Sequence, residues 1–313
     1  MKRIQNIVAV SRRTLPFTVT YAVIVWLLAG LIGQGWWLQF VCFVVSVYLM
    51  MQLNNENVLI RVFSRMVSAS YIVLSCAALF LFSSLPGAFL QLTAIALLFC
   101  LFRTYQDRSS AGWTYYGFLF IGLGSLLDVH VFYFMPAFWL MMLLTLYSLS
   151  WRTFLASLYG IITPYWFSLA WYVWRGEGDI TPWLQHLWGF VDLQLPASYS
   201  VFSLQHVLLL AFLVSLFLLG AIHFIATSYK DKMRVRQIYY SFMVLMIFSC
   251  LLIGIQPQLY DLAFHMMIIA VSPFIAHFFA LTDSRLTNIL FFVVAAITLF
   301  LTSMNLWISL SVF

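Results

Sequence analysis

Residues 175–202 read RGEGDITPWLQHLWGFVDLQLPASYSVF, the longest stretch of the chain between two apolar segments. We read seven apolar segments before it and four after it. Three of the nine acidic residues lie within it, against one basic residue. The stretch therefore predicts a polar connection on one face of a membrane, with hydrophobic helices on either side of it in the chain.

A short amphipathic helix is predicted inside this connection. Thr181 is expected at the N-cap and Pro182 at the first helical position, since proline lacks only an N–H that would be unpaired there. The apolar residues that recur at helical spacing are Trp183, Leu184, Leu187, Trp188 and Val191. The segment is too short and polar to span, so we expect it to lie in the interface with both tryptophans toward lipid.

The composition excludes a soluble domain. Hydrophobic residues make up 64% of the 313 residues, charged residues only 8%, and the mean hydropathy is +1.01. Soluble domains carry about 25% charged residues, so this chain cannot cover itself with a water-facing surface. The formal charge of +6 comes from basic residues scattered over short loops, which indicates membrane orientation and not a nucleic-acid partner.

The apolar pattern predicts an all-α, polytopic bundle of about eleven transmembrane helices, in one domain that covers residues 1–313. The expected spans are 15–33, 36–53, 67–85, 86–102, 113–127, 131–149, 153–174, 203–227, 238–256, 261–281 and 286–312. The opening segment MKRIQNIVAVSRR, followed by the first apolar run, predicts an uncleaved signal anchor. The four cysteines all fall in apolar segments, so neither a disulfide nor a structural zinc site is expected.

The basic residues predict an orientation. If the N-terminus is cytoplasmic, this span count leaves only Arg175 of the fifteen Lys and Arg residues outside. Cytoplasmic loops carry an excess of Lys and Arg, so we expect N-in, C-out topology in a bacterial inner membrane. The 175–202 connection and its interfacial helix are then extracytoplasmic.

Ionisable residues at membrane depth are costly to bury and are therefore candidates for function. Asp128 and His130 lie in the tight turn between the fifth and sixth spans. Asp261 and His265 stand four residues apart at the outer end of the tenth span, so their side chains can meet on one helix face. These four are the predicted catalytic residues. Such groups can act as a general base toward an acceptor, or hold a divalent metal through oxygen and imidazole ligands.

Other polar and aromatic residues on the same face are predicted to bind a substrate or a lipid headgroup; they are Trp183, His186, Trp188, Asp192 and His206. A purely structural explanation stays open for each site. Asp128 can cap a helix, His130 can reach the interface, and Asp261 can favour the positive end of a helix dipole. The basic run at 229–236 is read as a topogenic signal, with binding of anionic lipid or of a partner's acidic loop as the alternative. We assign no metal or other cofactor.

Two stretches carry a resemblance to known families. FRTYQDRSSAGWTYYGFLFIGLGSLLDVHVFYFMPAFWLMML, and KDKMRVRQIYYSFMVLM with IIAVSPFIAHFFALTDSRLTNILFF, resemble an uncharacterised family of Bacteroidota multi-pass inner-membrane proteins. The segments GLGSLL, FMPAFWL and SWRTF look like the rear half of the polyprenyl-phosphate-sugar-dependent (GT-C) glycosyltransferases. Those enzymes place a catalytic acid in a long first outer loop, whereas the first outer turn here is only Gln34–Trp36, without an acid.

The expected function is envelope biogenesis, in which the protein handles a lipid-linked, polyprenyl-phosphate substrate at the outer leaflet in a GT-C-like manner. Its expected partners are membrane lipids, a lipid-linked glycan and other membrane proteins. One alternative is a non-catalytic subunit that anchors an envelope complex. A transporter or flippase is the third reading, although midplane polar residues and an internal repeat, which are typical of transporters, are not evident. Whether the protein is an enzyme stays open at this point.

Overall fold

The structure is a computed structural model, and it describes residues 3–175, 180–191 and 199–311. Every regular element in these residues is a helix, which confirms the all-α class. The first half of the chain forms α1 (Ile4–Val10), α2 (Thr14–Leu28), α3 (Trp37–Asn57), α4 (Met66–Ala77), η1 (Leu79–Leu81), α5 (Leu85–Arg103), α6 (Ala111–Ser125), η2 (Val129–Phe134), α7 (Met135–Leu140) and η3 (Met141–Thr145). The second half forms α8 (Trp151–Trp174), α9 (Thr181–Trp188), η4 (Gly189–Val191), η5 (Tyr199–Val201), α10 (Leu204–Thr227), η6 (Ser228–Lys230), α11 (Met233–Ile255), η7 (Pro257–Leu259), α12 (Tyr260–Leu281) and α13 (Arg285–Ser311).

Among the described residues, six helices are long and apolar enough to cross a membrane. They are Trp37–Asn57, Leu85–Arg103, Leu204–Lys230, Met233–Ile255, Pro257–Leu281 and Arg285–Ile308. Three apolar helices are shorter: Thr14–Leu28, Met66–Ala77 and Val129–Thr145. The protein is thus a multi-pass helical membrane protein, while the count of eleven spans and the N-in orientation remain predictions.

The expected boundaries differ from the observed ones where the helix type changes. The predicted span 131–149 is not one α-helix, because η2 is a 3₁₀ segment, α7 follows it, and η3 is a π-helix. The predicted span 67–85 ends its α-helix at Ala77 and continues as the 3₁₀ turn η1. Thr181, expected as an N-cap, is instead the first residue of α9.

Capping residues position the helices that matter for the site. Ser84 caps α5, since its hydroxyl accepts the backbone N–H of Gly87 at 3.1 Å. Ser150 and Thr153 form a capping box at the start of α8, in which each side chain accepts the other's backbone N–H. These side chains satisfy backbone donors that the first turn of a helix leaves unpaired.

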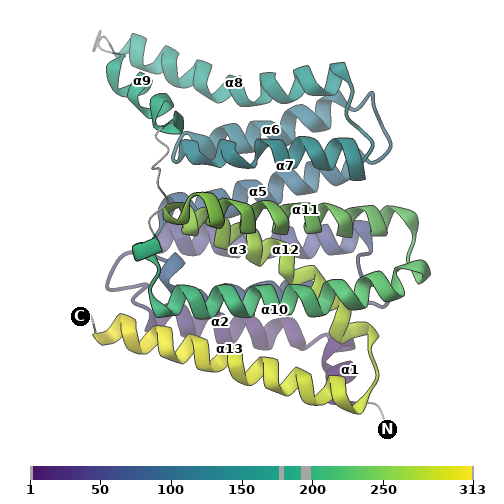
Figure 1. The fold of residues 1–313 in the computed structure, drawn as a ribbon. Coiled ribbons are helices and arrows are strands. Elements are labelled where there is room, and N and C mark those ends of the chain that lie inside the picture. The colour runs from purple at the N-terminus through teal and green to yellow at the C-terminus, as the bar shows by residue number, and fades with distance from the viewer. Residues whose placement is uncertain (1–2, 176–179, 192–198, 312–313) are drawn as a thin grey trace.

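Helix α12 is the centre of the bundle. Every residue from Leu262 to Phe279 is buried, and α12 contacts α4, α5, α10 and α11. In Figure 1, α12 runs through the middle of the bundle, with α8 at one edge and α13 at the other. A helix buried on all sides brings its polar residues against several other elements at once.

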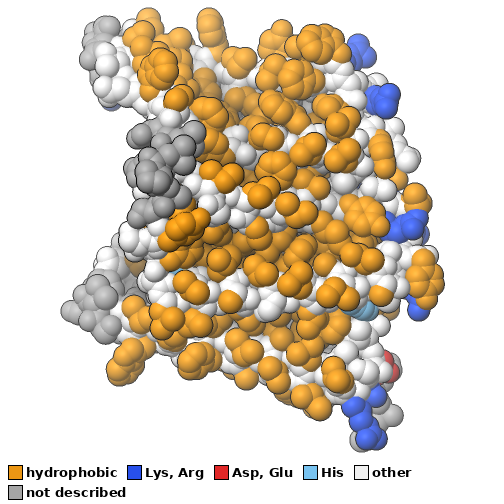
Figure 2. Space-filling view, in the orientation of Figure 1, with side chains coloured by type: hydrophobic (Ala, Val, Ile, Leu, Met, Phe, Trp, Pro, Cys, Tyr) orange, Lys and Arg blue, Asp and Glu red, His pale blue; other side chains and the backbone are white. Residues whose placement is uncertain are grey.

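The two ends of the bundle differ in charge. On the face drawn in Figure 2, Lys and Arg side chains gather at the end where α1 begins, and hydrophobic side chains cover the rest. We call this end the basic end and the opposite one, which carries α9, the α9 end. A broad apolar surface with charges confined to its margin is typical of a protein in a bilayer.

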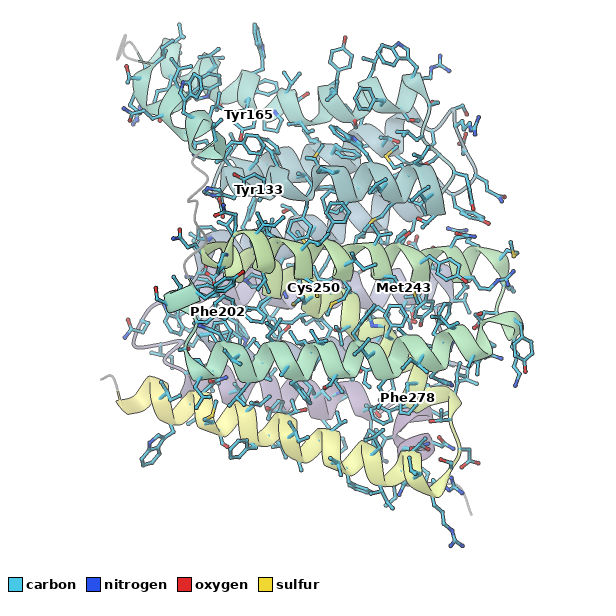
Figure 3. All side chains as sticks on the ribbon, viewed as in Figure 1. Tyr133, Tyr165, Phe202, Met243, Cys250 and Phe278 are labelled. Atoms are coloured by element: carbon cyan, nitrogen blue, oxygen red, sulfur yellow. The ribbon has the colours of Figure 1, made fainter. Side chains whose placement is uncertain are left out.

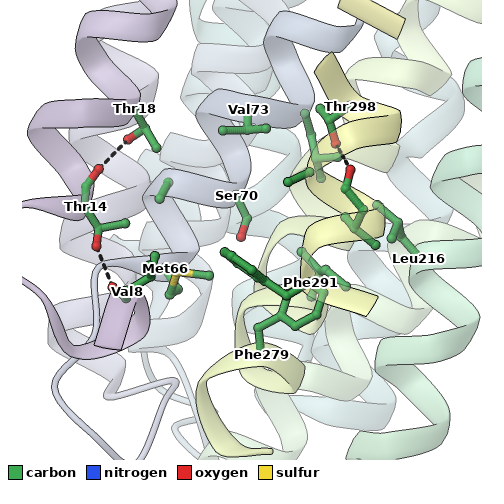
Figure 4. A pocket seen from close by; sticks show the side chains of 15 residues that line it. Val8, Thr14, Thr18, Met66, Ser70, Val73, Leu216, Phe279, Phe291 and Thr298 are labelled. Carbon is green, nitrogen blue, oxygen red and sulfur yellow. Dashed lines mark hydrogen bonds between the residues drawn. The ribbon is translucent and has the colours of Figure 1, made fainter. Parts of the chain in front are cut away.

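An apolar cavity of about 150 Å³ lies between α2, α4, α10, α12 and α13 (Figure 4). Three threonines line it, and each hydroxyl donates to a backbone carbonyl: Thr14 to Val8, Thr18 to Leu15, and Thr298 to Val294. Because these donors are satisfied elsewhere, the cavity presents hydrocarbon and is expected to stay dry.

Candidate functional site

The turn between α6 and η2 holds Asp128 and His130 in a hydrogen-bonded pair. Nδ1 of His130 lies 2.6 Å from Oδ1 of Asp128, and the backbone N–H of His130 donates to the same oxygen at 3.0 Å. Asp128 is also the N-cap of η2. The carboxylate is therefore both a helix cap, as the structural explanation required, and the partner of an imidazole.

This arrangement favours the charged carboxylate. Burial raises the pKa of Asp128. The hydrogen bonds from His130 and the charges of His130 and His186 together lower this pKa by more than burial raises it. The net pKa of Asp128 lies below its usual value. The side chains of Asp128 and His130 remain 30% and 29% exposed, so a polar group can approach the pair from outside.

Asp261 lies at the same end of the bundle, in the first turn of α12. Its charge interacts with that of Asp128, although the two residues lie far apart in the sequence. The side chain of Ser84, at the start of α5, contacts the Asp261 carboxylate. A site shared by Asp128 and Asp261 stays a prediction.

His265 does not join this cluster. It is only 4% exposed, and neither ring nitrogen has a hydrogen-bond partner, so it forms no hydrogen bond with Asp261. Its Nε2 instead faces Gly87 of α5, where an added Cβ would lie 2.5 Å away. Asp261 and His265 thus lie four residues apart on α12 without a hydrogen bond between them, because tight packing of α5 on α12 encloses the imidazole.

Helix α9 covers the α9 end of α6 and α8. His186 places Nε2 at 2.8 Å from the carbonyl oxygen of Ser125. Trp183 donates its indole N–H to the hydroxyl of Ser168 at 2.9 Å, so it packs on α8 and only Trp188, 70% exposed, faces outward. This corrects the expectation that both tryptophans face lipid. Asp192 lies outside the described residues.

Aromatic rings extend the site along the same end. Tyr133 donates to the carbonyl of Phe190 at 2.6 Å and Tyr165 donates to that of Ser125 at 3.1 Å; both tyrosines lie near α9 in Figure 3. Phe190 also stacks on Tyr133, with ring centroids 5.0 Å apart. These contacts attach η4 to η2 and fix α9 beside the Asp128–His130 turn.

His206 is a packed side chain and not an open ligand. Its ring lies between Phe80 and Tyr260, with centroid separations of 4.5 and 4.4 Å. Nδ1 lies 3.1 Å from the hydroxyl of Ser203 within the first turn of α10. His206 is only 6% exposed. Its contact with Tyr260 places it one residue from Asp261, so it supports the start of α12.

A second charged cluster lies at the basic end, where the sequence predicted only orientation signals. Arg61 Nε lies 2.7 Å from Asp231 Oδ1 and forms an ion pair with it. His277 Nε2 lies 3.4 Å from Asp231 Oδ2, and the ring of His223 is 5.6 Å from that of His277. Burial raises the pKa of Asp231 despite the opposing charge of Arg61. The isolated acid within the basic run at 229–236 was the sequence signal for this cluster.

Within the described ranges, no three His, Cys, Asp or Glu side chains are grouped so as to hold a metal ion. The side chains at the α9 end that can carry chemistry are the imidazoles of His130 and His186 and the carboxylates of Asp128 and Asp261. Comparisons with family models, with curated proteins and with solved structures find no match to this chain.

Proposed function

We propose that this protein binds the headgroup of a lipid-linked, polyprenyl-phosphate-type substrate at the α9 end and acts on it, in a bacterial inner membrane with the α9 end outside. The observation that supports this most is the hydrogen-bonded Asp128–His130 pair, whose carboxylate interacts with the charge of Asp261. A carboxylate that fixes an imidazole raises its basicity and orients it toward a proton to be removed.

In this proposal the Asp128–His130 pair takes a proton from an acceptor hydroxyl. The hydroxyl oxygen forms a bond to the anomeric carbon of the lipid-linked sugar, the bond from that carbon to the phosphate oxygen breaks, and the polyprenyl phosphate leaves with the electron pair. Asp128 holds the ring of His130 through Nδ1 and stabilises the imidazolium that forms. Asp261 adds negative charge beside the pair, which favours the protonated imidazole further. The charge of His186, on α9, interacts with Asp128, so this second imidazole would also contact the substrate headgroup.

The position of the pair supports a lipid-linked substrate. It lies in the turn between α6 and η2, at the end of the bundle that carries α9, and Trp188 of α9 is 70% exposed. A substrate with a hydrocarbon tail can remain in the bilayer while its polar headgroup reaches Asp128 and His130 from the interface. The proposed orientation is supported by the basic residues, because the predicted topology puts all fifteen except Arg175 on the cytoplasmic face.

The test is complementation of a deletion strain, with lipid-linked glycans and envelope lipids measured by mass spectrometry. We expect Asp128→Asn and His130→Gln to be made and inserted at normal levels but to accumulate the same lipid-linked species as the deletion. The matched control is Asp107→Asn, a carboxylate in the α5–α6 connection that accepts hydrogen bonds only from Ser109. Full complementation by both site variants would favour the non-catalytic envelope subunit instead.

A further inference from the structure

A small polar cavity lies inside the apolar bundle, separate from the Asp128–His130 pair. It measures about 20 Å³ and is lined by α2, α3, α4, α5 and α12. Its walls include Trp26 of α2, Gln91 of α5 and His265 of α12, together with the apolar side chains of Phe43, Phe82 and Ile268. Gln39 and Ser75 also line it, so the walls combine hydrocarbon with five polar side chains.

Three of these polar side chains, those of Trp26, Gln91 and His265, are buried and carry unpaired polar atoms. Trp26 is 2%, His265 4% and Gln91 5% exposed. The indole Nε1 of Trp26, the amide Nε2 of Gln91 and both ring nitrogens of His265 have no hydrogen-bond partner in the described part of the chain. A buried polar atom left unpaired costs about 1–3 kcal/mol, and native structures leave very few. Several such atoms around one cavity indicate that something in the cavity pairs with them.

The donor and acceptor types define what that is. Trp26 Nε1 and Gln91 Nε2 can only donate hydrogen bonds, so their positively polarised hydrogens would repel a cation in the cavity. A neutral imidazole has one nitrogen that donates and one that accepts, so His265 can need a donor as well. An anion lacks a counter-charge here and would pay the cost of burial. The ligand must therefore be neutral, and must both donate and accept.

We infer that this cavity holds a buried water molecule that accepts from Trp26 and Gln91 and donates to His265. A cavity needs roughly 10–15 Å³ to hold one water, and a buried water commonly makes about three hydrogen bonds. The cavity volume and the unpaired atoms of Trp26, Gln91 and His265 match these requirements. Through this water, His265 links α12 to α2 and α5 in the core of the bundle.

Two valine substitutions give effects of opposite sign. Ala88 lines the polar cavity, and Ala295 lines the dry apolar cavity of Figure 4. In detergent or nanodiscs, Ala88→Val should lower Tm, because the added methyl groups displace the water and leave its partners unpaired. Ala295→Val should raise Tm or leave it unchanged, because it fills space that holds no water. An equal rise in Tm for both variants would overturn the proposal.

A second measurement is independent of packing strain at Ala88. In the Gln91→Leu background one polar partner of the water is gone, so Ala88→Val should lower Tm by less than it does in the wild type. An undiminished loss of Tm would show that only crowding is measured and would overturn the proposal.

Hydroxyl radicals made by X-ray radiolysis modify buried residues next to bound water. Trp26 should be labelled while Phe118, equally buried in the core, is not. An unlabelled Trp26 would show an empty cavity.

Discussion

A Cβ placed on Gly87 would lie 2.5 Å from Nε2 of His265 and 3.0 Å from Oγ of Ser84. Glycine at this position is what allows α5 to approach α12 closely enough to enclose the imidazole. Gly87→Ala should therefore destabilise the protein by about 1–3 kcal/mol, the usual cost of overpacking a core. Thermal denaturation of the detergent-solubilised protein measures this change in the free energy of unfolding.

The matched control is Gly254→Ala in α11, where nothing lies within 4 Å of the added Cβ. Its expected effect is neutral to stabilising, by up to about 1 kcal/mol from helix propensity. The double variant Gly87→Ala/His265→Ala should lose less stability than the sum of the two single variants, because the clash is gone. Strict additivity would mean that Gly87 and His265 are not in contact.

The lowered pKa of Asp128 predicts how its contribution to stability changes with pH. Because the folded state favours the carboxylate, the stabilisation is fully present above the ordinary pKa of 3.8 and is lost as the pH falls through the lowered value. The Tm difference between wild type and Asp128→Asn should shrink as the pH falls below 4, where the Asp128 carboxylate takes up a proton. A difference that keeps its full size well below pH 4 would contradict the hydrogen bonding seen at Asp128.

The ion pair between Arg61 and Asp231 should contribute to stability at neutral pH. Arg61→Gln leaves a buried carboxylate without its counter-charge, and the loss should be about 1–3 kcal/mol, moderated because the Arg61 side chain is 34% exposed. Burial raises the pKa of Asp231 in the folded protein. The folded state therefore loses stability as the pH rises through that pKa and the carboxyl ionises. The effect of Arg61→Gln should therefore be smaller at pH 4 than at pH 7. Arg65→Gln, which breaks no ion pair among the described residues, is the control and should match wild type.

Trp188 should lie in the membrane interface. In a background without the four native cysteines, Trp188→Cys in proteoliposomes should react with a water-soluble maleimide more slowly than Gly178→Cys does. Trp188 is 70% exposed on the surface of the protein itself, so only lipid can protect this position. Equal labelling rates at both positions would place α9 in water.

The orientation can be read from a fusion to the C-terminus. A reporter active only outside the cytoplasm, attached after Phe313, should be active if the chain makes eleven crossings from a cytoplasmic N-terminus. An inactive but well-expressed fusion would require an even number of spans. A cytoplasm-active reporter at the same position provides the reciprocal measurement.

The sequence by itself determined the membrane class and the helical elements, because both follow from local composition. A run of about twenty apolar residues must satisfy its backbone internally, and only a helix does so within one segment. The turn Asp128–His130 was also predictable, since a carboxylate two residues before an imidazole can bond to it and to its backbone N–H. These interactions lie within a few residues of chain.

The tertiary structure decided which distant residues meet. Sequence spacing placed Asp261 and His265 on one helix face, but the packing of α5 on α12 encloses His265, while the charge of Asp261 interacts with that of Asp128. The partner of Asp231 could not be read from its basic neighbours in the chain, because Arg61 comes from the α3–α4 connection. Periodicity defines the direction of a side chain relative to its own helix. Which helix lies in that direction depends on the arrangement of the whole bundle.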